Sequence, residues 1–176
     1  MSPEKEPARS VQAVSELVKA GVNVRLIIVG GGPLWNKIRK QSLGLPIEML
    51  GYVASREKVA SYLAAADIAI APGPLETFCL SALESLASGT PVVASKSSAV
   101  GEILNINSVK PAGAVANDNG AEFAVAIKQL LNKGRLRKVA REQAEKFSWA
   151  NTVDAMLDVH GAKKPMVTTK RRLKVA

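Results

Sequence analysis

The chain has 176 residues, one cysteine and a formal net charge of +9, and 47% of its residues are hydrophobic. This length is sufficient for one domain to bury most of its surface, and the composition is globular, which excludes a disordered chain. A lone cysteine excludes an internal disulfide and is typical of a reducing cytoplasm. No apolar run reaches the roughly 18 residues of a membrane-spanning helix, and the N-terminal residues lack the apolar core of a signal peptide.

Apolar spacing and turn residues predict an alternation of helices and strands. The predicted helices span residues 7–20, 33–43, 56–66, 78–88, 99–104, 121–131, 136–146 and 149–159. The predicted strands span residues 24–29, 47–53, 67–71, 91–95 and 113–116. The β-branched run 24–29 is typical of a strand buried on both faces. We expect Pro33 at the first position of its helix and Ser55 as the N-cap of the next.

This alternation predicts an α/β fold with a Rossmann-like parallel sheet and helices on both faces. Such a unit normally opens with a strand. Here residues 1–6 lead directly into a helix, so we expect the first strand to be missing and the chain to be the later part of something longer. We expect residues 1–160 to form one domain and residues 161–176 to form a disordered tail.

The positive charge is concentrated in residues 161–176, which contain six basic residues and no acidic one. The basic residues are Lys163, Lys164, Lys170, Arg171, Arg172 and Lys174. One interpretation is a solvated tail. The other is attraction to an anionic membrane surface, at about 1 kcal/mol per basic residue. Nucleic acid is not expected as a partner, because the tail has no aromatic residues to interleave with bases.

Three consecutive glycines, residues 30–32, follow the first predicted strand. The dinucleotide fingerprint G-x-G-x-x-G would require a third glycine where this chain has Trp35, and an acid at the end of the next strand. Glu48 lies instead at the start of that strand, so the oxidoreductase interpretation is excluded. Two interpretations stay open: the glycines make a tight turn, or they admit a ligand at the carboxyl end of the strand.

The segment PGPLETFCLSALE, residues 72–84, carries a more specific pattern. A helix beginning near Phe78 would present the N–H groups of residues 78–80 as a site for a diphosphate. A carboxylate at this site can contribute to binding only if it accepts hydrogen bonds from hydroxyl groups. Glu76 and Glu84 can therefore contact the hydroxyls of a nucleotide sugar from two sides. The alternative for Glu84 is a capping box with Ser81.

The pattern from Glu76 to Glu84, followed by SGTPVV, resembles the retaining glycosyltransferases of the GT-B fold, family 4. The sequence of this segment is most similar to that of the GDP-mannose-dependent α-mannosyltransferases of actinobacteria. The resemblance also includes SPEKE, LIIVGGGP, LGYV, AAADIAIAP and FSWANTVDAML. It implies the C-terminal, donor-binding half of such an enzyme. The family's N-terminal half, its catalytic histidine and an arginine before SPEKE are not in this sequence.

The resemblance implies a role for each matching position. Lys5 would contact the donor diphosphate, Glu76 the transferred sugar and Glu84 the ribose hydroxyls. The other donor-binding residues that it implies are Gly30, Gly31, Gly32, Gly51, Tyr52, Val53, Lys58, Thr77, Phe78, Cys79 and Leu80. No Asp-x-Asp motif is present, and neither a metal nor a cofactor is expected.

Three of the polar residues also have ordinary interpretations. Lys5 can be a solvated lysine at a helix start. Cys79, expected at a helix N-terminus, is either a thiol of lowered pKa or a small packed side chain. His160, on the terminal helix, is expected to have a surface or packing role.

The function implied is transfer of a hexose, mannose among the candidates, from a nucleotide-diphosphate sugar to a lipid or glycan. We expect the isolated chain to be inactive or very weak. The expected partners are the sugar nucleotide, an N-terminal acceptor-binding half or chain, and a membrane contacted through the tail. The expected location is the cytoplasm, with peripheral contact at the inner face of the membrane. The alternatives are a non-catalytic nucleotide-sugar-binding module that needs a partner chain, and a membrane adaptor.

Overall fold

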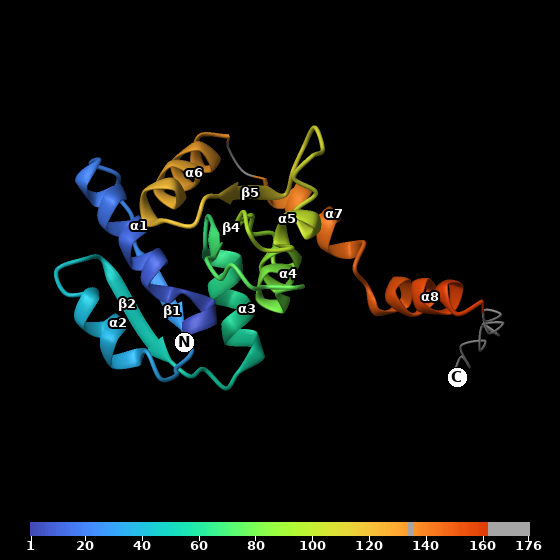
Figure 1. Ribbon diagram of the computed structural model, residues 1–176, viewed down its shortest axis with the longest axis horizontal. Coiled ribbons are helices and arrows are strands. Elements are labelled where there is room, and N and C mark those ends of the chain that lie inside the picture. Colours follow the sequence, from blue (N-terminus) through green and yellow to red (C-terminus); the bar gives the residue numbers. More distant parts are fainter. Residues whose placement is uncertain (134–135, 162–176) are drawn as a thin grey trace, which may run out of the picture. The chain divides into compact units, whose positions relative to one another are not determined.

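The computed structural model describes residues 1–133 and 136–161. They fall into two compact units: unit 1 is Met1–Glu145, and unit 2 begins at Lys146. The helices of unit 1 are η1 (Pro3–Lys5, a 3-10 helix), α1 (Pro7–Lys19), α2 (Trp35–Gln41), α3 (Arg56–Ala65), α4 (Leu80–Ala87), α5 (Val100–Ile103), α6 (Gly120–Asn132) and α7 (Arg137–Glu145). Its strands are β1 (Leu26–Val29), β2 (Ile47–Gly51), β3 (Ala69–Ala71), β4 (Val92–Ser95) and β5 (Gly113–Ala116) (Figure 1). The predicted α/β alternation is confirmed.

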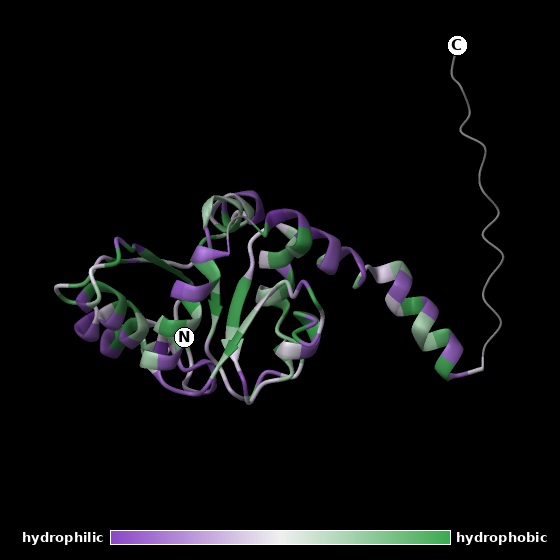
Figure 2. Ribbon diagram, turned by 90° about the horizontal axis from the view of Figure 1, so that it is seen from above, coloured by the Kyte–Doolittle hydropathy of each residue, from purple (hydrophilic) through white to green (hydrophobic). Residues whose placement is uncertain are grey.

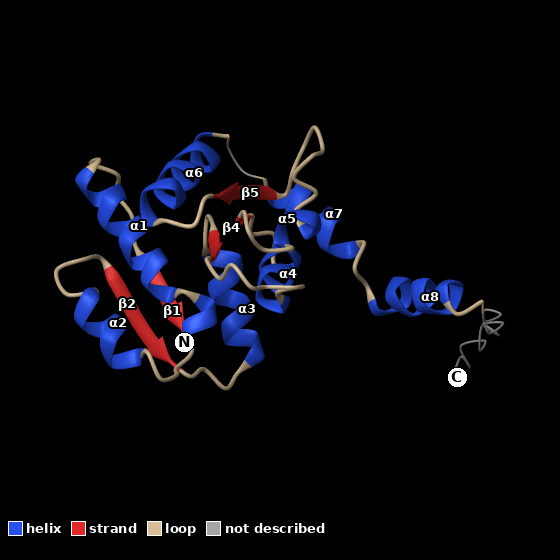
Figure 3. Cartoon of the chain, in the orientation of Figure 1, coloured by secondary structure: helices blue, strands red, loops and turns tan. Residues whose placement is uncertain are grey.

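The strands form two parallel sheets (Figure 3). β1 pairs with β2, and β4 lies between β3 and β5. In the doubly wound order 3-2-1-4-5-6 these strands correspond to 3-2 and 4-5-6, an order in which β1 and β3 are the neighbours of strand 1. Residues 1–6, which precede α1, contain only η1. The single sheet expected from the sequence is therefore two sheets, because no strand in the described residues joins β1 to β3.

Helices cover both faces of the three-stranded sheet, as predicted. All four residues of β4 are buried. Val93 belongs to a core that includes Leu17 of α1 and Phe123 of α6, and these two helices lie side by side (Figure 1). Val92 and Ala94 alternate with Val93 and point to the opposite face, where α4 contacts β3 and β4. Both are fully buried, which is typical of a central parallel strand.

The two-stranded sheet differs from the prediction in its burial. β1 begins at Leu26, and Ile27 and Val29 are 38% and 39% exposed, so burial alternates along this strand. The prediction of a strand buried on both faces is wrong here, because one face of β1 has no full cover in the described residues. Pro33 is also not the first residue of α2. It is the second residue of a turn closed by the Trp35 N–H, which donates to Gly32 O at 3.0 Å.

Unit 2 contains α8 (Trp149–Val159), whose N-cap Ser148 accepts a hydrogen bond from the Asn151 N–H. Hydrophobic and hydrophilic residues alternate along this helix (Figure 2). Trp149 and Met156 are among its exposed side chains. His160, its C-cap residue, is exposed, which favours the surface role over the packing role. The predicted basic tail lies, from residue 162 onward, outside the described residues. Across the two described ranges, no helix combines the length and the apolar character needed to cross a membrane.

Candidate functional site

The glycine loop after β1 meets two other segments of unit 1. The Gly30 N–H donates to Gly51 O at 2.7 Å, which joins the ends of β1 and β2. The N-terminal residue lies on the other side: the Met1 ammonium donates to Gly31 O, and the Leu34 N–H donates to Met1 O at 3.2 Å. Gly32 has φ 143°, and a Cβ at this position would lie 2.5 Å from Met1 O. Glycine is therefore required here by both backbone conformation and close approach.

The loop after β3 meets the same N-terminal segment. A Cβ on Gly73 would lie 2.8 Å from Glu4 O and 3.2 Å from the Cα of Lys5. This contact brings η1 against the loop that carries Glu76. The Lys5 Nζ lies 2.5 Å from Glu76 Oε1, and the Glu76 side chain is only 13% exposed. The structure thus places together the two residues to which the family resemblance gives contacts with the diphosphate and the sugar.

The ion pair keeps Lys5 charged. The hydrogen bond with Glu76 is the main cause that raises the pKa of the Lys5 ammonium; partial burial opposes it, and the Glu76 charge adds to it. The Lys5 side chain is 53% exposed, so the interpretation of a solvated lysine at a helix start stays open beside this pairing. Since a cation held at a fixed position interacts strongly with a phosphate oxygen, this side chain has the chemistry expected of a diphosphate ligand.

The helix α4 begins later than predicted. Its N-cap is Cys79, whose φ of 58° is left-handed, and its first residue is Leu80. The N–H groups of Ala82 and Leu83 both donate to Cys79 O. The helix N-terminus therefore presents the N–H groups of Leu80 and Ser81, and the predicted start at Phe78 is wrong. The left-handed residue at position 79 turns the chain, so residues 78 and 79 are not helical.

This helix start also excludes the capping box. Ser81 lies inside α4 and its Oγ is 3.3 Å from the Cys79 Sγ, so it is not the N-cap. Glu84 occupies the second turn of α4 and is exposed. Cys79 itself is 8% exposed, in keeping with a packed small side chain.

The remaining predicted residues lie at the surface of unit 1. Tyr52 is 84% exposed and Val53 is half-buried, just beyond β2. The Lys58 N–H donates to the Oγ of Ser55, the N-cap of α3, as predicted for that cap. Thr77 is exposed next to Glu76. Within the described ranges, no hydrogen bond or ion pair connects these side chains to the Lys5–Glu76 pair, so their roles stay predictions.

A polar cluster beside this site was missed by sequence reasoning. Arg9 of α1 is 9% exposed and lies 3.2 Å, through its Nη1, from Asp118 Oδ1; the same nitrogen donates to Pro72 O. Ser95 and Ser97 donate to the two oxygens of Asp118. Partial burial works against ionisation of Asp118, but the hydrogen bonds from the two serines and the charge of Arg9 outweigh it and lower its pKa. No local signal reveals a pair 109 residues apart in the chain.

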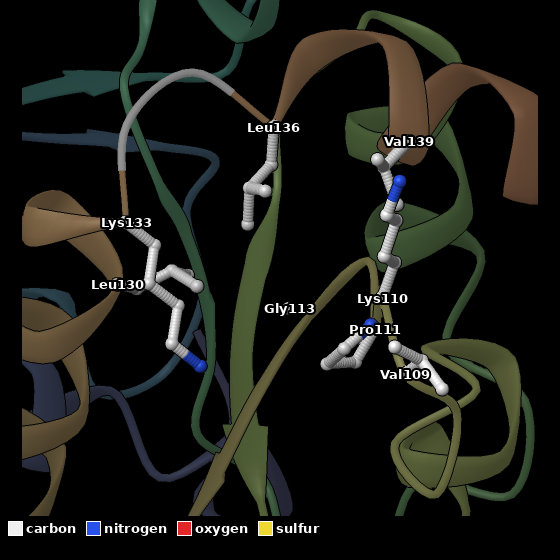
Figure 4. Close-up of a pocket in the computed structure, with 8 residues that line it drawn as sticks. All are labelled: Val109, Lys110, Pro111, Gly113, Leu130, Lys133, Leu136 and Val139. Carbon is white, nitrogen blue, oxygen red and sulfur yellow. The ribbon is translucent and has the colours of Figure 1, made fainter.

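A separate cavity lies at the opposite end of β5. It has a volume of about 390 Å³, and Gly113, the first residue of β5, lies on its wall (Figure 4). Its lining is mainly apolar, with Lys110 and Lys133 at its rim, and it contains none of the predicted site residues. Ligands of parallel sheets bind at the carboxyl ends of the strands, so this cavity is not the candidate site. Elsewhere in the described part of the chain, no three His, Cys, Asp or Glu side chains gather in a way that could hold a metal ion.

A glycine loop after β1, a fixed cation on η1 and the helix N-terminus after β3 belong to a parallel α/β domain, in which ligands usually bind at the carboxyl ends of the strands. Comparison with protein families gives the particular class. Residues 1–147 match the family described as "Glycosyl transferases group 1", and the chain belongs to this family. The resemblance stated from the sequence is confirmed.

Several curated relatives match most of this chain. A "GDP-mannose-dependent alpha-(1-6)-phosphatidylinositol dimannoside mannosyltransferase" of Mycobacterium tuberculosis is 43% identical over 164 residues, which is 92% of this chain and 42% of the relative. A "D-inositol 3-phosphate glycosyltransferase" of Mycolicibacterium smegmatis is 37% identical over 106 residues, 58% of this chain and 24% of the relative. The chain therefore spans less than half the length of these curated relatives.

Solved structures confirm the fold. TarM superposes with a TM-score of 0.77 at 24% identity, over 92% of this chain and 34% of TarM. HepE of Anabaena in complex with UDP-glucose superposes with a TM-score of 0.73 at 20% identity, over 91% of this chain and 46% of HepE. The fold is that of GT-B glycosyltransferases, of which this chain matches one part.

Proposed function

We propose that this chain is the donor-binding half of a retaining glycosyltransferase, which transfers a hexose from a nucleotide-diphosphate sugar to a lipid or glycan acceptor. The observation that carries the proposal is the Lys5–Glu76 pair, at 2.5 Å, between η1 and the loop before α4. A cation and a carboxylate held together suit a ligand that carries both a diphosphate and sugar hydroxyls.

In the proposed reaction the chain acts mainly by electrostatic stabilisation. Negative charge develops on the diphosphate as its bond to the sugar breaks. The Lys5 ammonium and the first N–H groups of α4 would stabilise that charge, since donors already fixed in place need no reorganisation. Glu76 would orient the sugar by accepting hydrogen bonds from its hydroxyls. No metal or cofactor is assigned a role.

We propose GDP-mannose as the donor. The support comes from the mycobacterial relative, whose name states dependence on GDP-mannose and which is 43% identical over 92% of this chain. HepE, solved with UDP-glucose, is 20% identical. The same relative's name contains phosphatidylinositol dimannoside, which favours a glycolipid as the acceptor of the complete enzyme.

Isothermal titration calorimetry tests the donor proposal. We expect the chain to bind GDP and GDP-mannose more tightly than UDP and UDP-glucose. Equal affinity for both bases would overturn the assignment of guanine. No binding of any of the four compounds at millimolar concentration would overturn the donor-site proposal itself.

A second candidate function is a nucleotide-sugar-binding module that completes a separate chain. The mannosyltransferase relative contains a part that this chain does not match, since the chain covers 42% of it. Co-expression with the part of that relative that this chain does not match, followed by a mannosyl transfer assay, distinguishes the two. Transfer only in the co-expressed sample supports the module, and transfer by the chain alone contradicts it.

We further propose peripheral contact with the cytoplasmic face of a membrane through the six basic residues of positions 161–176. Each basic residue near an anionic surface contributes about 1 kcal/mol, and salt screens this attraction. Sedimentation with phosphatidylserine vesicles should show binding that falls with salt and disappears when residues 163–176 are deleted. Binding that survives both changes would contradict the proposal.

A further inference from the structure

One arginine and one aspartate connect three strand-end loops in unit 1. Arg9 Nη1 of α1 donates to the carbonyl of Pro72, directly after β3, and lies 3.2 Å from Asp118 Oδ1, after β5. Ser95, the last residue of β4, and Ser97 donate to Asp118. The loops after β3, β4 and β5 thus share a single cluster of charge-assisted hydrogen bonds, which are stronger than neutral ones.

Two backbone hydrogen bonds link this cluster to the candidate site. The Ala99 N–H, four residues beyond Ser95, donates to Glu76 O at 2.9 Å. The Lys96 N–H donates to Ala116 O at 2.8 Å, which keeps the β4 and β5 loops together. Glu76 is therefore held on one side through Pro72 and on the other through Ala99. Pro72 contacts Arg9 directly, and Ala99 lies in the loop whose residues Ser95 and Ser97 contact Asp118.

Burial makes the two charges depend on each other. The Arg9 side chain is 10% exposed and the Asp118 side chain 31% exposed. The guanidinium also lies over the ring of Phe123 of α6, 5.9 Å from the ring centroid. Phe123 belongs to the hydrophobic core of unit 1. If Asp118 loses its charge, a nearly buried guanidinium loses its counter-ion, and buried charges are found paired for that reason. Arg9 would then move toward water and release Pro72.

We propose that the Arg9–Asp118 ion pair is the positioning element of the donor site, which holds the loop 72–79 so that Glu76 stays beside Lys5. This inference rests on the proposed function for the meaning of the site, but the geometry it describes is independent of any ligand. Arg9 and Asp118 are positioning residues, since they act on the donor through Glu76 and not by contact.

Amide hydrogen exchange on the full chain tests the positioning. In Asp118→Asn, exchange of the Ala99 amide should accelerate by about tenfold more than exchange of the Val93 amide in β4, because a loop that loses its anchor opens locally. The matched control is Thr90→Val. Thr90 is fully buried just before β4, and its Oγ1 donates to Leu63 O and, at 3.4 Å, to Ala66 O. This control should change both amides equally.

A second variant and a second readout complete the test. Arg9→Met should reproduce the Ala99 effect, so the result does not depend on how one variant folds. The gain in affinity for GDP-mannose over GDP, measured by calorimetry, should be lost in Asp118→Asn and stay within about twofold of the wild-type gain in Thr90→Val. Equal acceleration at Ala99 and Val93 in both site variants would overturn the proposal. A wild-type chain that binds no GDP would overturn the proposed function instead, and the exchange rates would then decide whether the pair holds the loop.

Discussion

Lys5 and Glu76 are 71 residues apart in the sequence and form an ion pair whose Nζ and Oε1 atoms lie 2.5 Å apart. The pair joins η1, which precedes α1, to the loop after β3, and ligands of parallel sheets bind at such strand-end loops. The Glu76 carboxylate pairs with the Lys5 ammonium, which a diphosphate would contact in the proposed donor site. Donor binding would therefore exchange one anionic partner of Lys5 for another.

This exchange gives opposite predictions for the two members of the pair. Lys5→Met should weaken GDP binding at least tenfold, because a hydrogen bond to a charged group contributes about 1.5–3 kcal/mol. Glu76→Gln should leave GDP affinity unchanged or raise it, since a competing anion is removed, and should abolish any gain in affinity for GDP-mannose over GDP. Calorimetry with both ligands measures these effects. Lys19→Met is the control, because Lys19 pairs with Glu16 on the exposed face of α1; a similar loss in this variant would contradict a specific role of Lys5.

Two glycines of the site should respond differently to alanine. In Gly73→Ala the new Cβ would lie 2.8 Å from the backbone oxygen of Glu4, so the loop or η1 must move. We expect a loss of about 1–3 kcal/mol in the free energy of unfolding, together with weaker GDP binding. Gly31 is the matched control, since nothing lies within 4 Å of the place that an alanine methyl group would take and its φ is not left-handed. Urea denaturation measures both variants, and equal losses would show that the close approach at Gly73 is unimportant.

Asp118 makes stability depend on pH in the acid range. Its folded-state pKa lies below the ordinary value of 3.8, so its contribution is present above that value and is lost as the pH falls through the folded-state pKa. The free energy of unfolding of the wild-type chain should therefore decrease on acidification below about pH 4. Asp118→Asn should show a smaller decrease over the same range and a lower stability at neutral pH. Parallel acid limbs in urea titrations of the two proteins would contradict this assignment.

The N-cap of α3 offers a test of local structure away from the site. Ser55 accepts a hydrogen bond from the Lys58 N–H at 3.1 Å. Ser55→Ala should reduce the free energy of unfolding by about 1 kcal/mol, since an N–H at the first turn loses its acceptor. Ser61→Ala, within the same helix, removes a hydroxyl that donates to Glu57 O and should have little effect or stabilise the helix slightly. Thermal unfolding followed by circular dichroism compares the two variants.

Elements with local signals were predicted well. The predicted bounds of β5 and α8 coincide with those in the structure, and Ser55 is the N-cap of α3 as expected. These features depend on residues within one or two turns of the chain, such as a capping hydroxyl or an uninterrupted apolar run. The same is true of the Glu76 loop, which the proline and glycine residues of PGPLE identify as a loop.

Features that depend on distant residues were not predicted. The left-handed conformation of Cys79 places the start of α4 two residues later than predicted. Residue 79 is neither glycine nor asparagine, the residues that usually indicate this conformation. The Arg9–Asp118 pair requires α1 and the loop after β5 to meet, which a single sequence cannot show. The division into two sheets arises because no strand in the described residues joins β1 to β3, and pairing partners are set by topology and not by the strand sequences themselves.

The position of Met1 has a practical consequence for expression of the protein. Its ammonium donates to Gly31 O, and its carbonyl accepts from the Leu34 N–H. An affinity tag fused before Met1 would replace this ammonium by a peptide nitrogen and place the added residues next to the glycine loop, at Gly31 and Gly32. Nucleotide affinities measured on such a fusion would combine the effect of the site with that of the tag. Purification through a C-terminal tag leaves this corner of the molecule unaltered, and comparison of the two fusions would measure how much room the site allows.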